Sequence, residues 1–391
     1  MTSTADQPEI RRPDFLVFSD DWGEHPSSCQ HIFRHIAKDH RVLWVNTIGM
    51  RNPTFTLRDA RKAVRKVSKM VRRQKFRTTA HVPEGNIVVC QPRMIPGTRL
   101  SMIREFNARS VTKTVQSLLR DLEFDNPIVV TTVPNAAEYS ELLAARKVVY
   151  YCVDDFSLWP GLDAEIVRKM ESSIIFNADC LIAASGALYE RLSVSGKPTY
   201  LLTHGVDVPL FSSRVEYEHP KMAHIAKPRV GFFGLIDGRM DWELLVPLAQ
   251  KMVNTQFVFA GPVDASAGEL PKLDNLHFVG AIDYIDLPAF ICGVNVLILP
   301  YKTDGLSEFL SPLKLNEYLA TGKPIVCAPI RAAKDWIDRI QSARTTVEWE
   351  ELLRRILGTN FTHALTAIPQ SLARQSWDAK AKELLSICLR A

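Results

Sequence analysis

The stretch Ser311-Pro-Leu-Lys-Leu-Asn-Glu-Tyr-Leu-Ala-Thr-Gly-Lys-Pro-Ile-Val326 has the pattern of a capped helix, a glycine stop and a buried strand. Pro312 suits the first helical position, and Gly322 ends the helix. Lys314 and Glu317 lie one turn apart on a shared face. A helix N-terminus with a lysine can bind a diphosphate, and the glutamate one turn deeper can accept hydrogen bonds from sugar or ribose hydroxyls. The residues expected at this site are Ser311, Leu313, Lys314 and Glu317.

The bulk composition is that of a globular protein with more than one domain. The chain has 391 residues, of which 46% are hydrophobic and 23% are charged. Residues 1–12 are polar, and no apolar run approaches the roughly 20 residues that span a bilayer, which argues against a secretory signal and a transmembrane helix. Seven cysteines are scattered without a CxxC pair. This usage predicts free thiols in a reducing compartment and no structural zinc site.

Short apolar runs alternate with helix-length segments, which predicts parallel sheets covered on both faces. One series begins at Phe15–Phe18 and a second at Val230–Phe233. Residues 209–228, with three prolines and mixed charge, are interpreted as a linker. We therefore expect two Rossmann-like domains, residues 1–208 and 209–370, with ligands in a cleft at the carboxyl ends of the strands. The other expected strands are Arg41–Asn46, Asn86–Cys90, Ile128–Thr132, Val148–Cys152, Cys180–Ala184, Thr199–Thr203, Phe257–Ala260, Leu276–Val279, Val294–Leu299 and Ile325–Cys327.

The loop that follows the first apolar run carries acidic side chains, a tryptophan and a histidine. Hydrogen-bond acceptors beside a flat apolar ring suit the recognition of a sugar. The alternative is a solvated loop whose Asp or Ser side chains cap the next helix. The candidate acceptor-binding residues are Asp21, Trp22 and Glu24, and His25 is a catalytic candidate.

Two carboxylates, Asp154 and Asp155, follow directly on the buried run Val148–Val153. A carboxylate at this edge of a sheet can accept the proton of an attacking hydroxyl as a general base. Because adjacent side chains point in different directions, we expect one to be catalytic and the other to bond loop amides. The alternative is that both cap the helix expected near Asp163.

Gly234 and Arg239 follow the first strand of the second series. A glycine allows close backbone approach, and an arginine can pair with a phosphate. The GxGxxG fingerprint of dinucleotide-binding proteins is absent from the sequence. Tyr301 follows a later strand and begins the loop that leads to Lys314, so we expect it to contact the same ligand.

Residues 58–77 hold ten Lys or Arg and one Asp, a net charge of +9. The whole chain carries +5, so the remainder carries −4. The apolar residues of the segment recur at helical spacing opposite a basic face, as in helices that bind anionic membrane surfaces. A nucleic-acid site and a solvated surface helix are the alternatives. The residues expected to contact the membrane are Arg61, Lys62, Arg65, Lys66, Lys69, Arg72 and Arg73.

Across most of its length the chain resembles the GT-B glycosyltransferases. Their retaining subgroup has an E-x7-E donor motif, whose second glutamate, which holds the ribose, matches Glu317, whereas the first falls on Phe309. The segments SPLKxxEYLA and VDDF are similar to those of teichuronic-acid-type (family 4-like) transferases. The xanthan-type glucuronosyltransferase, which is inverting and membrane-associated, is more distantly similar. Its general base falls on Asp154, and a lysine of its donor helix falls on Lys314.

The resemblance implies a GT-B fold with two Rossmann-like domains facing across a cleft, and residues 371–391 as a helix that packs back on the first domain. It implies a metal-independent, hexosyltransferase-type enzyme without a cofactor. This enzyme would move sugar from a UDP or GDP sugar to a saccharide acceptor, expected to be lipid-linked, in bacterial cell-surface or exopolysaccharide synthesis. We expect it in the cytoplasm, peripheral on the inner face of the membrane, with no nucleic-acid partner. The alternatives are a nucleotide-sugar epimerase of the same fold and a non-catalytic nucleotide-binding scaffold.

Overall fold

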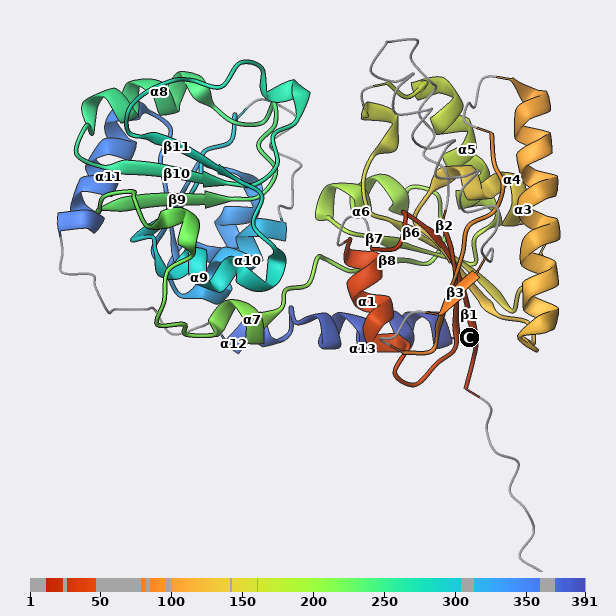
Figure 1. The fold of residues 1–391 in the computed structure, drawn as a ribbon. Coiled ribbons are helices and arrows are strands. Elements are labelled where there is room, and N and C mark those ends of the chain that lie inside the picture. The colour runs from red at the N-terminus through yellow and green to blue at the C-terminus, as the bar shows by residue number, and fades with distance from the viewer. Residues whose placement is uncertain are drawn as a thin grey trace, which may run out of the picture. The chain divides into compact units, whose positions relative to one another are not determined.

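The computed structural model describes residues 12–23, 27–46, 79–81, 85–95, 100–140, 143–159, 161–303, 313–358 and 370–390. The chain divides into two compact units (Figure 1). Unit 1 contains the described residues up to Thr203 together with those from Lys380, and unit 2 is His204–Ala379. Each unit is built on one sheet. None of the helices in these ranges is both long and apolar enough to cross a membrane.

The sheet of unit 1 has the strand order β3-β4-β2-β1-β5-β6-β7-β8 in the described ranges. Every strand pairs in parallel except β3, which is antiparallel to β4. The central strand β1 is buried at every residue, as expected when both faces of a parallel sheet are covered. The strands are β1 Phe15–Ser19, β2 Val42–Asn46, β3 Thr79–His81, β4 Ile87–Cys90, β5 Ile128–Thr131, β6 Lys147–Cys152, β7 Cys180–Ala183 and β8 Thr199–Leu201.

Three helices of unit 1 begin at side-chain caps that the sequence supplies. The side chains of Ser27, Asp163 and Ser185 accept hydrogen bonds from backbone amides in the first turns of α1, α5 and α6. The helical segments are α1 Ser28–Ile36, α3 Ser101–Asp121, η1 Pro134–Ala136, α4 Ala137–Ser140, η2 Phe156–Leu158, α5 Ala164–Asn177 and α6 Gly186–Ser193.

Unit 2 contains a parallel sheet of order β11-β10-β9-β12-β13-β14. Its strands are β9 Arg229–Phe233, β10 Gln256–Ala260, β11 Leu276–Gly280, β12 Val296–Leu299, β13 Ile325–Cys327 and β14 Ile340–Ser342. Its helical segments are α7 Val208–Ser212, η3 Pro220–Met222, α8 Trp242–Lys251, η4 Ala265–Ala267, η5 Tyr284–Asp286, α9 Leu287–Cys292, α10 Leu313–Thr321, η7 Arg331–Trp336, α11 Thr346–Gly358 and α12 Gln370–Ala373.

Residues 209–228, which we interpreted as a linker, are part of the packed body of unit 2. Phe211, Met222 and Ile225 are buried in its core. Pro209 and Pro220 lie in the first turns of α7 and η3, where a residue without an N–H loses no helical hydrogen bond. These two prolines therefore mark helix starts in a packed segment, and the linker interpretation is wrong.

The expectation of a single helix over residues 371–391 is also wrong. The structure has two helices, α12 and then α13 (Trp377–Leu389). Between them the chain forms a bridge to the start of unit 2, where the N–H of Val206 donates to the carbonyl oxygen of Gln375 at 2.7 Å. The hydroxyl of Ser376 then accepts a hydrogen bond from the N–H of Ala379 and caps α13. The part of α13 from Lys380 belongs to unit 1, where Lys147 Nζ donates to the carbonyl oxygen of Ile387 at 3.4 Å.

Candidate active site

In unit 2, Lys314 of α10 lies against the carboxyl end of β9. A Cβ atom placed on Gly234 would lie 1.6 Å from Cε of Lys314, so the lysine fills the space that a side chain at position 234 would need. Gly234 has a φ of +132°, which favours glycine. At the end of the neighbouring strand β10, a Cβ on Gly261 would lie 1.8 Å from the carbonyl oxygen of Gly234. Lys314 therefore lies over Gly234, whose backbone is packed against Gly261. These two glycines are called the glycine floor.

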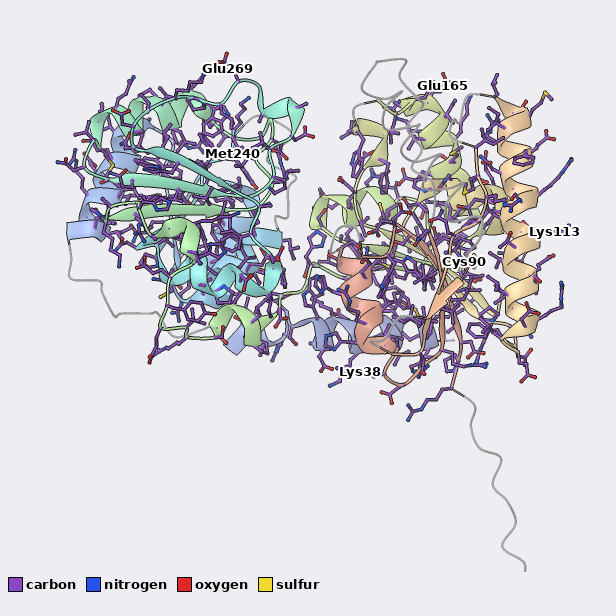
Figure 2. All side chains as sticks on the ribbon, viewed as in Figure 1. Lys38, Cys90, Lys113, Glu165, Met240 and Glu269 are labelled. Atoms are coloured by element: carbon purple, nitrogen blue, oxygen red, sulfur yellow. The ribbon has the colours of Figure 1, made fainter. Side chains whose placement is uncertain are left out.

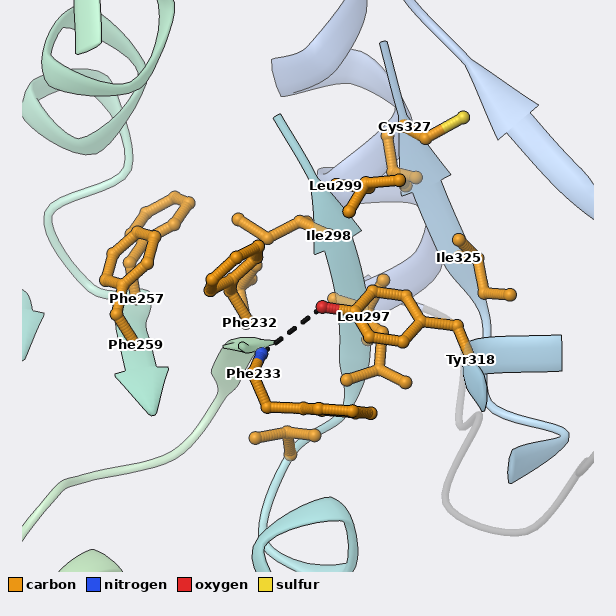
Figure 3. Packing of buried hydrophobic residues seen from close by; sticks show 14 of the residues in the cluster. Phe232, Phe233, Phe257, Phe259, Leu297, Ile298, Leu299, Tyr318, Ile325 and Cys327 are labelled. Carbon is orange, nitrogen blue, oxygen red and sulfur yellow. Dashed lines mark hydrogen bonds between the residues drawn. The ribbon is translucent and has the colours of Figure 1, made fainter. Parts of the chain in front are cut away.

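Helix α10 is held in place by contacts of the residues that follow Lys314. The hydroxyl of Tyr318 accepts a hydrogen bond of 3.2 Å from the N–H of Phe233, the last residue of β9 (Figure 3). Asn316 Nδ2 donates to the carbonyl oxygen of His204 at 3.0 Å. Leu315 and Tyr318 are buried in the core. These contacts fix the start of the helix, and with it the position of Lys314.

Glu317 lies one turn after Lys314 and is only 6% exposed. Within the described ranges, no hydrogen bond to its carboxyl group is found. Burial raises the pKa of Glu317 to about 7, against a smaller lowering by Lys314. The pKa of Tyr284 is raised by burial and then by the nearby carboxyl groups of Glu317 and Asp207. A buried carboxyl group without a partner is costly, so it suits a site that a ligand completes.

Replacing Glu317 by glutamine is expected to change the pH dependence of stability. The carboxyl group is protonated up to about pH 7 when folded but ionises above its ordinary value of 4.5 when unfolded. Its stabilising contribution is therefore complete below pH 4.5 and is lost as the pH rises through 7. The free energy of unfolding of the Glu317→Gln protein, relative to that of the wild type, should rise by up to about 3 kcal/mol between pH 4.5 and pH 8. Hydrogen exchange of β9 and β12 peptides measures this in unit 2; a stability difference that is constant with pH would contradict it.

Arg239 is already bound by a carboxylate of its own turn. Its Nε lies 2.9 Å from both carboxylate oxygens of Asp237, and one terminal nitrogen lies 2.6 Å from Oδ2. The guanidinium lies 5.2 Å from the ring centroid of Tyr301, which is itself 1% exposed. A phosphate would have to compete with Asp237 for Arg239. This geometry favours a packing role for both residues, and their contact with a ligand stays a prediction.

In unit 1, the two carboxylates after β6 have different environments. Asp155 caps η2, because its Oδ1 accepts from the N–H of Ser157 at 3.0 Å and from its hydroxyl at 2.6 Å. Asp154 is exposed, with one oxygen 2.8 Å from the N–H of Asp155 and the other 2.9 Å from Nε1 of Trp159. The cap of α5 is Asp163, not this pair. Asp154 is therefore the better placed of the two to receive a proton.

An ion pair between the buried Glu171 and the partly exposed Arg191, which our sequence analysis missed, holds the end of β6. The guanidinium of Arg191, on α6, contacts both carboxylate oxygens of Glu171, on α5, at 2.6 and 2.9 Å. Tyr150 donates its hydroxyl to Glu171 at 2.8 Å, and Cys152 Sγ donates to the carbonyl oxygen of Asp154 at 3.5 Å. Because the two charged residues are far apart in sequence, no spacing rule shows that they meet.

The loop after β1 is organised by the carboxylate of Asp20. This carboxylate accepts hydrogen bonds from Ser27 Oγ at 2.9 Å and Gln30 Nε2 at 2.5 Å. The ring of Trp22 packs edge-on against Trp44 at 4.8 Å. The acceptor-binding roles of Asp21 and Trp22 stay predictions. Several predicted residues lie outside the described ranges: Glu24, His25, Ser311, Arg61, Lys62, Arg65, Lys66, Lys69, Arg72 and Arg73.

The chain is similar to known glycosyltransferases in sequence and in fold. Residues 227–357 match the family model for glycosyl transferases group 1. The putative teichuronic acid biosynthesis glycosyltransferase TuaH of Bacillus subtilis (strain 168) is 23% identical over 279 residues, which are 65% of this chain and 70% of that protein. Sucrose-phosphate synthase from Thermosynechococcus elongatus aligns over 96% of this chain and 98% of its own, with a TM-score of 0.67 and 15% identity. Anabaena HepE, solved in complex with UDP and glucose, aligns over 96% and 99%, with a TM-score of 0.63 and 15% identity.

The chain has the GT-B fold. In this GT-B protein the group 1 match covers the candidate donor residues of unit 2, including Gly234, Lys314 and Glu317. Asp154 lies in the other Rossmann-like unit, outside the matched range.

Proposed function

We propose that this protein is a glycosyltransferase whose donor is a nucleoside diphosphate sugar bound by unit 2. The observation that carries the proposal is Lys314 over the glycine floor, one turn from the buried and unbonded Glu317. The lysine and the positive start of α10 suit a diphosphate, and Glu317 suits the hydroxyls of the ribose. The group 1 family match over these residues supports the donor class. The binding of UDP by HepE, which shares the fold, favours a uridine nucleotide over a guanosine nucleotide.

In the proposed reaction an acceptor hydroxyl attacks the anomeric carbon of the donor sugar. A bond forms between the acceptor oxygen and that carbon, and the bond from the carbon to the phosphate oxygen breaks. Asp154 takes the hydroxyl proton as general base. The nucleoside diphosphate leaves with the electron pair, and Lys314 stabilises its growing charge. Because a cation from the protein performs this task, the proposed mechanism requires no metal ion. Direct attack with Asp154 as base would invert the anomeric carbon.

We further propose a lipid-linked saccharide as the acceptor, at the inner face of a bacterial membrane. The relative TuaH is described as a putative teichuronic acid biosynthesis enzyme, which favours a cell-surface polysaccharide. The charge of +9 on residues 58–77 suits an anionic membrane surface where such an acceptor lies. Asp21, Trp22, Glu24 and His25 remain the proposed acceptor contacts.

Replacing Lys314 by alanine is expected to weaken nucleoside diphosphate binding roughly 10- to 100-fold, because a charge-assisted hydrogen bond is lost. Titration calorimetry with UDP and GDP, in buffer with EDTA, measures the change. Lys251→Ala is the matched control, since Lys251 ends α8 and precedes β10, at the opposite edge of the sheet from Gly234. Equal affinity of the wild type and the Lys314→Ala protein would remove Lys314 from the donor site.

The proposed activity itself is tested with nucleotide sugars in the presence and absence of saccharide acceptors. Nucleotide binding appears as a rise in melting temperature. Release of nucleoside diphosphate that depends on an acceptor supports a transferase. Conversion of the donor sugar without an acceptor would indicate an epimerase, and binding without turnover would indicate a scaffold; either result would overturn the proposal.

A further inference from the structure

Helix α3 of unit 1 begins with large apolar side chains that face solvent. Leu100 is 63% exposed, Met102 81% and Phe106 51%, and Ile95, just before the helix, is 46% exposed. These four residues are called the apolar tip. The other face of the helix, with Ala108, Val111 and Val115, is buried against the sheet, so the tip is not part of the core of unit 1.

The exposed residues of α3 are apolar at the start of the helix and cationic further along it. Met102 and Phe106 lie one turn apart, and Arg109 and Lys113 continue the same face over the next two turns. Arg109 is 83% exposed and lies 3.6 Å from Glu105, and Lys113 lies on the outer side of the helix (Figure 2). Arg93, beside the tip, is exposed too. An apolar end followed by a cationic ridge is the charge pattern of a segment at the interface of an anionic bilayer.

The topology places the tip at the same edge of the sheet as Asp154. Because α3 follows the carboxyl end of β4, its first turns lie at the carboxyl edge of the parallel sheet. Arg104, in the first turn, pairs at 2.8 Å with Glu138 of α4, which follows the carboxyl end of β5. Strand β6, which carries Asp154 at its end, is the next neighbour of β5. Four strand spacings separate β4 from β6, about 19 Å.

We infer that the apolar tip of α3 inserts into the interface of an anionic membrane, with Arg93, Arg109 and Lys113 at the lipid headgroups. Insertion removes the exposed apolar side chains from water, and the cations gain the attraction of anionic lipids. The long basic side chains can reach the headgroups while the helix end lies deeper. Since the tip shares its edge with Asp154, insertion keeps the base beside a lipid-linked acceptor. That last step rests on the proposed function, whereas membrane insertion of the tip does not.

Flotation of the full chain with vesicles of phosphatidylglycerol and phosphatidylcholine tests the inference. The Met102→Ser/Phe106→Ser protein should lose roughly tenfold in its partition coefficient, because two apolar side chains no longer enter the interface. The matched control is Phe176→Ser/Val194→Ser, which removes apolar side chains that are 77% and 86% exposed elsewhere on unit 1 and should partition like the wild type. Equal partitioning of the tip variant and the wild type would overturn the inference, as would a wild type that does not bind these vesicles.

Hydrogen exchange on the wild type separates the tip from residues 58–77. Docking through residues 58–77 alone would leave the exchange of residues 100–110 unchanged by vesicles and would overturn insertion of the tip. We expect vesicles to slow exchange in residues 100–110. The tip variant should keep its UDP-induced rise in melting temperature and its transfer to a water-soluble acceptor, but lose transfer to an acceptor embedded in vesicles. A failure of nucleotide binding in the wild type would overturn the proposed function and leave the vesicle result standing.

Discussion

Replacing Asp154 by asparagine is expected to lower the rate of sugar transfer about 10³-fold while leaving nucleotide affinity unchanged. An amide cannot accept the proton of the attacking hydroxyl, so the loss falls on the chemical step. In the proposed function the donor is bound by unit 2, whereas Asp154 belongs to unit 1. Single-turnover rates with a saturating donor, beside calorimetry with UDP, separate the two quantities. A rate near that of the wild type would exclude Asp154 as the base.

Two neighbouring substitutions distinguish loss of a base from damage to its loop. Trp159→Phe removes the indole N–H that lies 2.9 Å from the carboxylate of Asp154 but keeps that carboxylate. Asp155→Asn keeps an oxygen that can cap η2, because asparagine is as good a cap as aspartate. Both proteins should keep transfer within about tenfold of the wild type. A loss in the Trp159→Phe protein as large as that in the Asp154→Asn protein would mean that loop geometry, and not proton transfer, accounts for the effect.

Elements with local start and stop residues could be predicted closely from the sequence. The expected helix before Gly322 is α10, and the strand Ile325–Cys327 is observed with the bounds we expected. The strands expected to begin at Phe15 and Ile128 begin there in the structure. These elements depend on apolar runs, caps and glycine stops, all of which are readable within a few residues.

Elements that depend on distant partners could not be predicted in this way. The three-residue strands β3 and β14 lie at sheet edges and are defined by pairing with β4 and β13. The break between α12 and α13 is defined by the bridge to Val206, far away in sequence. A short apolar or polar run has no intrinsic preference strong enough to show such pairing.

The same distinction applies to the candidate site. The residue types on α10 suggested a diphosphate and a ribose site, but the contact of Lys314 with the glycine floor needs the tertiary fold. For Arg239 the partner is local, since Asp237 is only two residues away. We still overlooked this pair, because an arginine after a strand suggested a phosphate contact. Of the two roles expected for the carboxylates after β6, the bonding of loop amides is observed for Asp155, which caps η2, and the catalytic role stays a prediction.

Replacing Arg229 by methionine is expected to destabilise unit 2 by about 3–5 kcal/mol, because it removes a buried guanidinium and leaves the buried carbonyl oxygens that it binds unsatisfied. Arg229 is 4% exposed, at the start of β9. Its guanidinium contacts the carboxylate of Glu218 at 2.6 Å and the carbonyl oxygens of Met222, Ile225 and Gly293. It thereby joins the packed segment before β9 to the sheet. Lysine at this position should not restore stability, since a single ammonium group cannot reach all these acceptors.

The chain contains its own control, because a second cation binds the same carboxylate. Lys227 Nζ also lies 2.6 Å from Glu218, but its side chain is 61% exposed. Lys227→Met should therefore cost no more than about 1 kcal/mol, as is usual for an ion pair in water. Thermal denaturation compares the stability of the two proteins. Limited proteolysis within residues 209–228 reports whether this segment leaves unit 2. If both substitutions cost the same, charge on Glu218 would be the common cause; a large loss confined to Arg229→Met would show that the buried carbonyl contacts hold this segment on unit 2.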